Sequence, residues 1–164
     1  MRDFEIPIQD FAYKFAIKEH QEIKDAALNA IEQMGKFSYY CEDQRISHTD
    51  WHLNVSHVRA YADIVMPVLI SYFPLEGLEI KQFWFQQYEA GDYHGIHSHD
   101  DCNFSSVYYL ELPDNSIKTK YHGQAEIDIN EGDFLIMPAH IKHLSPYVNS
   151  GRKTSIVLNL NLKS

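Results

Sequence analysis

Basic residues are scarce in this chain. The 14 Lys and Arg stand against 23 Asp and Glu, and the formal net charge is −9 at pH 7. A chain with this balance repels a phosphate backbone unless a local basic patch overrides its net charge, and the sequence contains no such patch. The charge therefore argues against nucleic acid as a partner.

Long apolar runs are also missing. The longest, residues 64–70, is far too short to span a bilayer, and the first ten residues, MRDFEIPIQD, lack the apolar segment of a signal peptide. The only cysteines, Cys41 and Cys102, show no C-x-x-C spacing, which favours reduced thiols over a disulfide framework. These absences predict a cytoplasmic protein that does not enter the membrane.

Neither an internal repeat, a low-complexity stretch nor a linker divides the chain. Its 164 residues suit one domain, and 45% hydrophobic with 23% charged residues is ordinary for a globular fold. We expect a single domain over residues 1–164. In it, a mostly helical N-terminal part, residues 1–76, packs on a sheet formed by residues 77–164.

Two helices are predicted in the first half. Apolar residues at 23, 26, 27, 30, 31 and 34 have the three-and-four spacing of an amphipathic helix over residues 19–34, which Gly35 ends. A second helix is predicted from about His57 to Tyr72, with Pro67 as a kink or break. Residues 37–53 have no clear period and predict irregular structure or short strands.

The second half predicts antiparallel strands. Short runs rich in β-forming residues, separated by turn-forming residues, occupy residues 80–88, 105–112, 125–129, 133–138 and 154–162. In the last run, Ile156, Leu158 and Leu160 alternate with Val157 and Asn159. We therefore expect one face of this strand to enter a core and the other to end in polar groups.

Histidines cluster in the strand-rich half, at positions 94, 97, 99, 122, 140 and 143. A single histidine is more often a surface or hydrogen-bonded residue than a metal ligand. His97 and His99 differ, because side chains two apart in a strand point to the same side and can converge on one ion. The third candidate is His140 or His143, which follow an apolar strand.

We favour His143 because Arg152 follows it nine residues later, enough for a turn and a return into the next strand. Arg152 would then face the same cavity, where a guanidinium suits a carboxylate bidentately. A carboxylate-bearing small molecule is thus the expected ligand. The alternative for Arg152, in the segment SGRK, is a solvated turn residue.

Several blocks around these residues resemble the iron(II)- and 2-oxoglutarate-dependent oxygenase superfamily, particularly its short bacterial and phage members. The matching blocks are WFQQY (84–88), Gly91, His97, His99, SSVYYL (105–110), GDFLIMP (132–138), His143, Arg152 and SIVLN (155–159). The resemblance covers the strand-rich half only. It implies that this half is a double-stranded β-helix, a jelly roll or cupin-like barrel whose open mouth holds the metal. Together with the two predicted helices, we expect a mainly β fold with N-terminal helices.

The resemblance also implies roles for individual residues. His97 and His143 would bind iron(II), and Arg152 would bind the far carboxylate of 2-oxoglutarate. The hydroxyls of Tyr88 and Tyr109 would help to hold this small-molecule cosubstrate. The implied activity is that of a dioxygenase, most simply a hydroxylase, acting on an acceptor substrate that the sequence leaves open.

One position departs from the family pattern. The residue two after the first histidine is usually Asp or Glu, completing a two-histidine, one-carboxylate triad, and here it is His99. Three ligand sets follow. We favour three histidines (His97, His99 and His143); the alternatives are a shifted set of His99, Asp101 and His143, or Asp100 entering from the loop.

Other functions stay open at this point. A cupin-type metal-dependent dioxygenase or isomerase fits the spacing of Gly91, His97 and His143, and it would need neither 2-oxoglutarate nor Arg152. A non-catalytic jelly-roll binding protein is the second alternative. A homodimer is a further expectation, because short jelly rolls often dimerise.

Overall fold

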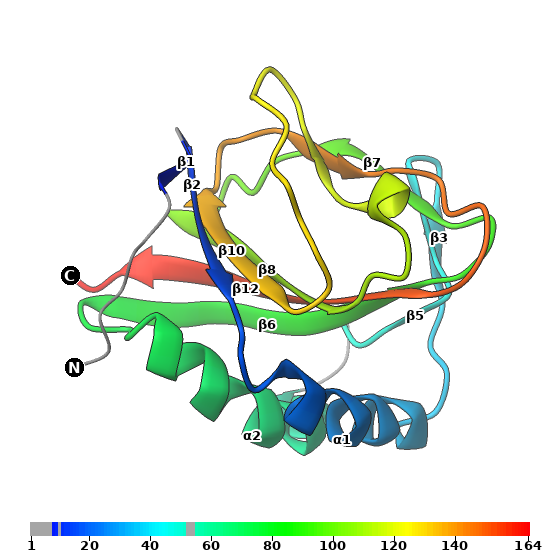
Figure 1. Ribbon diagram of the computed structural model, residues 1–164, viewed down its shortest axis with the longest axis horizontal. Helices are drawn as coiled ribbons and strands as arrows, with labels where there is room; N and C mark the ends of the chain where they lie inside the picture. Colours follow the sequence, from blue (N-terminus) through cyan, green and yellow to red (C-terminus); the bar gives the residue numbers. More distant parts are fainter. Residues whose placement is uncertain (1–7, 10, 52–54) are drawn as a thin grey trace.

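Two antiparallel sheets and two helices make up the part of the chain that the computed structural model describes, residues 8–9, 11–51 and 55–164. The expectation about a signal peptide rests largely on residues outside this part. Figure 1 shows both helices beneath the larger sheet and the smaller sheet on the opposite side. None of the helices in the described residues is long and apolar enough to cross a membrane.

The larger sheet has seven strands within the described residues. Their order is β1 (Ile8–Gln9), β2 (Ala12–Ala16), β10 (Asp133–Pro138), β8 (Phe104–Glu111), β12 (Lys153–Leu162), β6 (Leu78–Tyr88) and β5 (His48–Thr49). The smaller sheet, counted over the same residues, has five. Their order is β3 (Tyr39–Cys41), β4 (Gln44–Ile46), β7 (Tyr93–His97), β11 (His143–Ser145) and β9 (Lys120–Tyr121). A short 3₁₀ turn, η1 (Asn115–Ile117), precedes β9.

The two predicted helices are present. Helix α1 (His20–Gln33) buries Ile23, Ala27 and Ile31 on one face, as the spacing predicts, and Gly35 follows it with a φ of 81°. Helix α2 (Val55–Tyr72) runs on through Pro67, so the proline does not break it. Both helices contribute to an apolar core against the larger sheet.

The expectation of a mostly helical N-terminal part was wrong in one respect. Residues 8–49 also supply five strands, and these complete both sheets: β2 pairs with β10, β5 with β6, and β4 with β7. Runs of two to five residues are too short to display a two-residue period. The N-terminal part is therefore interleaved with the sheets rather than only packed on them.

The long strands agree with prediction, with two differences. Residues 125–129 form no strand; Ile127 and Ile129 are buried between the sheets, and the Lys118 ammonium donates to the Ile127 carbonyl. In β12, residues 153–160 are buried on both faces of the strand, and even the polar Asn159 is only 1% exposed. One face packs on the helices, while the other faces the smaller sheet across a cavity instead of solvent.

Candidate metal centre

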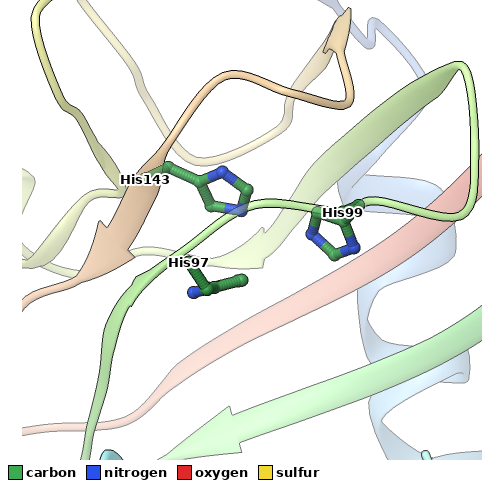
Figure 2. A group of neighbouring side chains, drawn as sticks. All are labelled: His97, His99 and His143. Carbon is green, nitrogen blue, oxygen red and sulfur yellow. The ribbon is translucent and has the colours of Figure 1, made fainter.

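Three histidine rings meet where the ends of β7 and β11 lie side by side. His97 closes β7, His143 opens β11, and the two residues are direct partners in the antiparallel pairing, with ring centroids 4.4 Å apart. His99 lies two residues beyond β7, where its backbone N–H donates to the Ala139 carbonyl at 2.9 Å. One nitrogen of each ring lies within 4.8 Å of the others (Figure 2).

Backbone carbonyls orient two of these rings. The Nδ1 atoms of His97 and His143 lie 2.8 and 2.9 Å from the carbonyl oxygens of Gly95 and Ile141. An Nδ1–H that donates to a carbonyl leaves the Nε2 lone pair free for a metal. These hydrogen bonds therefore prepare both imidazoles as ligands.

An amide orients the third ring. The Asn159 side-chain nitrogen lies 3.2 Å from Nδ1 of His99 and donates to the Gln82 oxygen at 2.8 Å. A half-turn of both the Asn159 and Gln82 amides would let the Asn159 oxygen accept from the Gln82 amide and from an Nδ1–H of His99 instead, which frees Nε2 of that ring. Asn159 and Gln82 thus support His99 from the floor of the cavity.

The rings are held in their neutral form. Burial, together with repulsion from neighbouring imidazoles, lowers the pKa of His143 to about 3 and that of His99 to about 4. Burial also lowers the pKa of His97. A metal binds neutral imidazole, so at pH 7 no proton has to leave before the ion enters.

The remaining histidines of the cluster lie differently. His94 stacks on His97 with centroids 3.7 Å apart, and burial with repulsion from His97 lowers its pKa to about 2. His94 lines the same cavity but does not belong to the three-ring group. His122 and His140 are exposed.

No carboxylate joins the three rings among the described residues. Asp101 lines the cavity, but its side chain is 60% exposed and pairs with Lys81 at 3.0 Å. Asp100 accepts a hydrogen bond from the Ser98 hydroxyl at 3.2 Å. In this structure Asp101 is paired with Lys81 and Asp100 with Ser98, and neither carboxylate belongs to the three-ring group.

A cavity of about 350 Å³ extends from the histidines between the two sheets. At its buried end lie Tyr88, Lys153, Ser145 and Thr119, and at its open end Trp51, Ser98, Asp100 and Asp101. Its lining includes buried polar atoms without a hydrogen-bond partner, namely Trp84 Nε1 and Ser155 Oγ. Buried polar atoms of this kind mark a space built for a polar ligand.

Lys153 is the unusual group at the buried end. Its side chain reaches between the Tyr88 and Tyr109 rings, with Nζ 5.3 and 5.8 Å from their centroids, and donates to the Ser145 hydroxyl at 2.8 Å. The residue is 1% exposed, and no carboxylate of a described residue pairs with it. Burial lowers its pKa to about 7. A carboxylate from a ligand would supply the missing counter-charge.

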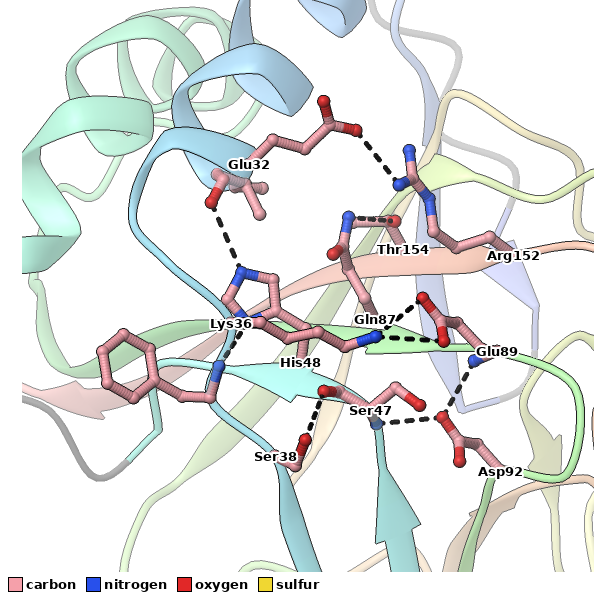
Figure 3. A network of polar contacts seen from close by, with 12 residues as sticks. Glu32, Lys36, Ser38, Ser47, His48, Gln87, Glu89, Asp92, Arg152 and Thr154 are labelled. Carbon is pink, nitrogen blue, oxygen red and sulfur yellow. Dashed lines mark hydrogen bonds and ion pairs between the residues drawn. The ribbon is translucent and has the colours of Figure 1, made fainter.

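The expectation that Arg152 faces this cavity was wrong. Its guanidinium turns away and binds Glu111 at 2.8 and 3.1 Å. It also binds Glu32 of α1 at 3.1 Å, as Figure 3 shows. Successive residues of a strand point to opposite faces, so the side chain that enters the cavity is that of its neighbour Lys153. The alternation of side chains along β12 was the one sequence signal that could have identified Lys153. It was missed because the predicted register was wrong by one residue.

The two predicted tyrosines lie near the lysine. Tyr88 lines the cavity and its hydroxyl donates to the Gln86 side-chain oxygen at 2.9 Å. Tyr109 lies behind Lys153, and burial raises its pKa to about 12. Both phenols are therefore protonated at neutral pH and offer hydrogen-bond donors rather than charge.

The donor set fits a metal ion. Three neutral imidazoles face one space, two of them fixed by backbone carbonyls, and the cavity beyond them is open to a further ligand. Imidazole is a suitable ligand for iron, zinc, copper and nickel. The group can therefore hold a divalent transition metal and leave coordination positions for a small molecule.

Gly95 is expected to be critical for the metal site. A Cβ at this position would lie 2.8 Å from the Asp43 carbonyl oxygen, while the Gly95 carbonyl orients His97. Gly95→Ala should therefore weaken metal affinity about ten- to hundredfold in a calorimetric titration, because it moves an outer partner of a ligand.

Gly123→Ala is the matched control for this prediction. Gly123 has a φ of 72° and open space around it, so alanine there strains the backbone away from the histidines. It should lower stability by about 1 kcal/mol without changing metal affinity. Equal metal affinities in the two variants would contradict the role assigned to Gly95.

Comparisons with known proteins identify the fold. Neither a protein-family model nor a curated protein sequence matches the chain. Solved structures do match. A viral collagen prolyl hydroxylase from Paramecium Bursaria Chlorella virus-1, in complex with 2-oxoglutarate, aligns with a TM-score of 0.67 at 14% identity, over 94% of this chain and 97% of that one.

Two further structures agree. An oxidoreductase of the 2OG-Fe(II) oxygenase family from Burkholderia pseudomallei aligns with a TM-score of 0.63 at 12% identity, over 93% of this chain and 86% of that one. HygX from Streptomyces hygroscopicus, with nickel and 2-oxoglutarate bound, aligns at 0.59 and 7% identity, over 93% and 83%. The chain therefore shares its fold with 2-oxoglutarate-dependent iron(II) oxygenases.

Proposed function

We propose that the protein is an iron(II)- and 2-oxoglutarate-dependent oxygenase, most simply a hydroxylase, built on a double-stranded β-helix. One observation carries the proposal: three neutral histidines and a buried lysine without a counter-charge face the same cavity. The fold shared with oxygenases of this kind supports it. The chemistry of the cavity then limits which small molecule can fill it.

Charge balance favours a dianion. Three neutral imidazoles leave the two charges of a divalent metal uncompensated, and a protonated Lys153 adds a third positive charge in a buried space. A 2-oxo acid with a second carboxylate offers an oxygen chelate for the metal and a carboxylate for the lysine. With both bound, iron(II) and 2-oxoglutarate supply the oxidation of a C–H bond by dioxygen, coupled to decarboxylation to succinate.

Different residues of this chain bind the metal and the cosubstrate. His97, His99 and His143 hold the metal. Lys153 and the Ser145 hydroxyl bind the far carboxylate, taking the role first assigned to Arg152. The Tyr88 ring and the side chains of Val107 and Val157 wall the cavity and keep water from the bound cosubstrate. A lysine serves here as a point charge, whereas an arginine would fork around the carboxylate.

Turnover without an acceptor tests the proposal. Loaded with iron(II) and given 2-oxoglutarate and dioxygen, the protein should form succinate slowly, and His143→Ala should not. Metal binding without affinity for 2-oxoglutarate would favour the cupin-type enzyme instead. Absence of metal binding would leave the non-catalytic binding protein.

The affinity for 2-oxoglutarate should depend on pH. Free Lys153 has a pKa of about 7, because burial disfavours its charged form, and a bound carboxylate would raise that pKa. Above pH 7 the free protein therefore loses a proton that the complex retains. Affinity should fall by up to about tenfold per pH unit from pH 7.5 upward, with uptake of a proton on binding.

Calorimetry in buffers of different ionisation enthalpy measures this uptake. The pKa values of His99 and His143, about 4 and about 3, lie far below pH 7, so these two histidines do not titrate in the range tested. An affinity that stays constant between pH 7 and 9, without proton uptake, would show that the amine of Lys153 does not receive the carboxylate.

A further inference from the structure

Both tryptophans of the chain stand in the cavity. Trp51 is 40% exposed at the open end, and Trp84 is 5% exposed on the cavity floor. Their rings are 6.4 Å apart and inclined by 26°, and the Trp84 ring is 6.2 Å from that of His99. A molecule lying against the indoles would therefore be next to the three-histidine group.

Trp51 is held in place rather than loosely attached. Its backbone N–H donates to the Thr49 hydroxyl at 3.2 Å, and Tyr39 meets it edge to face at 5.3 Å. The preceding residue, Asp50, is buried and accepts hydrogen bonds from Phe85 N at 2.9 Å and from the Tyr61 hydroxyl at 2.6 Å. A preorganised aromatic surface of this kind binds a ligand with little loss of side-chain entropy.

The polar groups around the indoles are mostly acceptors. Asp100 and Asp101 line the open end, and only Asp101 has a cationic partner, Lys81, among the described residues. The Gln44 side-chain oxygen is buried without a partner. Among the described residues, Lys153 is the one lysine or arginine in the cavity lining, and it lies at the opposite, buried end. Among the described residues at the open end, the charged side chains in the lining are the carboxylates of Asp100 and Asp101, and the nearby Lys81 ammonium is paired with Asp101.

A buried donor completes the set. Trp84 Nε1 lies in the cavity wall without a hydrogen-bond partner, which is costly unless a ligand oxygen accepts from it. Indole faces beside carboxylates are a common arrangement for binding organic cations. The open end thus offers a cation site and, deeper, a donor for a neutral oxygen.

We propose that this open end binds the acceptor substrate, and that the acceptor carries an ammonium or guanidinium group together with a carbonyl or hydroxyl oxygen. The cation lies against Trp51 and beside Asp100, the oxygen accepts from Trp84 Nε1, and the carbon chain between them is directed toward the histidines. The assignment of this ligand as the acceptor rests on the proposed oxygenase function. A basic amino acid, free or within a peptide, has this chemistry.

Intrinsic fluorescence tests the inference directly, because the two tryptophans are the only indoles of the chain. The zinc(II)-loaded protein with 2-oxoglutarate, which does not turn over, is titrated with N-acetyl-lysine methylamide and its arginine counterpart. Matched probes are the norleucine and glutamate methylamides, which keep the carbonyls but lose or reverse the charge. Free lysine separates an amino-acid substrate from a peptide residue.

The cationic probes should give a saturable change with affinity about tenfold or more above that of the norleucine probe, and the glutamate probe should not bind. Asp100→Asn should weaken the cationic probes by about three- to tenfold. Trp51→Ala should abolish saturable binding; Trp84 remains in this variant as the fluorophore that would report any binding. Trp51→Phe should retain binding. Glu126→Gln removes one negative charge at an exposed site outside this cavity and should titrate like the wild type.

Equal affinity for the norleucine and lysine probes, or preference for the glutamate probe, would overturn the inference. So would a Trp51→Ala variant that binds the cationic probes as the wild type does. Repeating the titration without metal and cosubstrate separates the two proposals. Cation binding that persists without any 2-oxoglutarate affinity would refute the oxygenase function alone.

Discussion

Lys153→Met is expected to weaken 2-oxoglutarate binding by about a hundredfold or more. The variant keeps the length and apolar stem of the side chain between the two tyrosine rings but removes the one positive charge at the buried end of the cavity. Loss of one partner from a buried charge pair typically costs 2 to 5 kcal/mol, about 30- to several thousandfold in affinity. Calorimetric titration of the metal-loaded protein measures the change.

Arg152→Gln provides the matched control one residue away. It breaks the ion pairs with Glu111 and Glu32, so the free energy of unfolding should fall by about 1 to 2 kcal/mol. Its affinity for 2-oxoglutarate should stay within about threefold of the wild type, because the side chain does not reach the cavity. The opposite result, with binding lost in Arg152→Gln and kept in Lys153→Met, would return the carboxylate site to Arg152.

His143→Ala is expected to abolish metal binding at micromolar concentrations. It removes one of the three proposed ligands and leaves two, which should lower affinity for a divalent ion by about a thousandfold or more, since a structural ion gains several kcal/mol per ligand. The exposed His140, three residues earlier, supplies the control: His140→Ala should bind metal normally. Equal retention of metal by both variants would refute the proposed three-histidine metal centre.

Two further variants separate the ligand sets that the sequence left open. If three histidines bind the metal, His99→Ala loses metal and Asp101→Asn keeps it, because Asp101 pairs with Lys81 at the surface. A shifted set predicts loss in both, and a set in which Asp100 replaces His99 predicts retention in both. The metal content of the purified variants, measured after reconstitution under reducing conditions, distinguishes the three cases.

Sequence patterns predicted the long elements, left residues 37–53 as irregular structure or short strands, and missed β2 and β11, for a physical reason. Helix α1 and strands β6, β8, β10 and β12 carry enough residues to repeat a period, whereas β3, β4, β5 and β11 have two or three residues each. Residues 125–129 alternate like a strand yet form none: Ile127 and Ile129 are buried in the core, while the Ile127 carbonyl accepts a hydrogen bond from the Lys118 ammonium. Alternation of apolar and polar residues indicates which side chains are buried. A strand also needs a neighbouring strand to pair with, which the alternation does not identify.

The sequence predicted which histidines converge, but not the other groups that line the cavity. His97 and His99 stood out by spacing, whereas His143 was preferred to His140 because of an expected position of Arg152 that the structure does not show. Their convergence depends on the pairing of His97 with His143, which is set by the register of β7 and β11. Arg152 was predicted to face the cavity, but its neighbour Lys153 does. The prediction was therefore wrong by one residue of register at the start of β12. Trp51 gave no signal because its segment has no period.

One measurement tests the proposed function most directly. Iron(II) and then 2-oxoglutarate are added to the protein without oxygen, and the weak visible charge-transfer band of the chelated cosubstrate is followed. The proposal predicts a saturable band in the wild type and in Arg152→Gln, and none in Lys153→Met or His143→Ala. Iron binding by the wild type without a band would contradict it, and so would a band that survives in Lys153→Met at wild-type affinity.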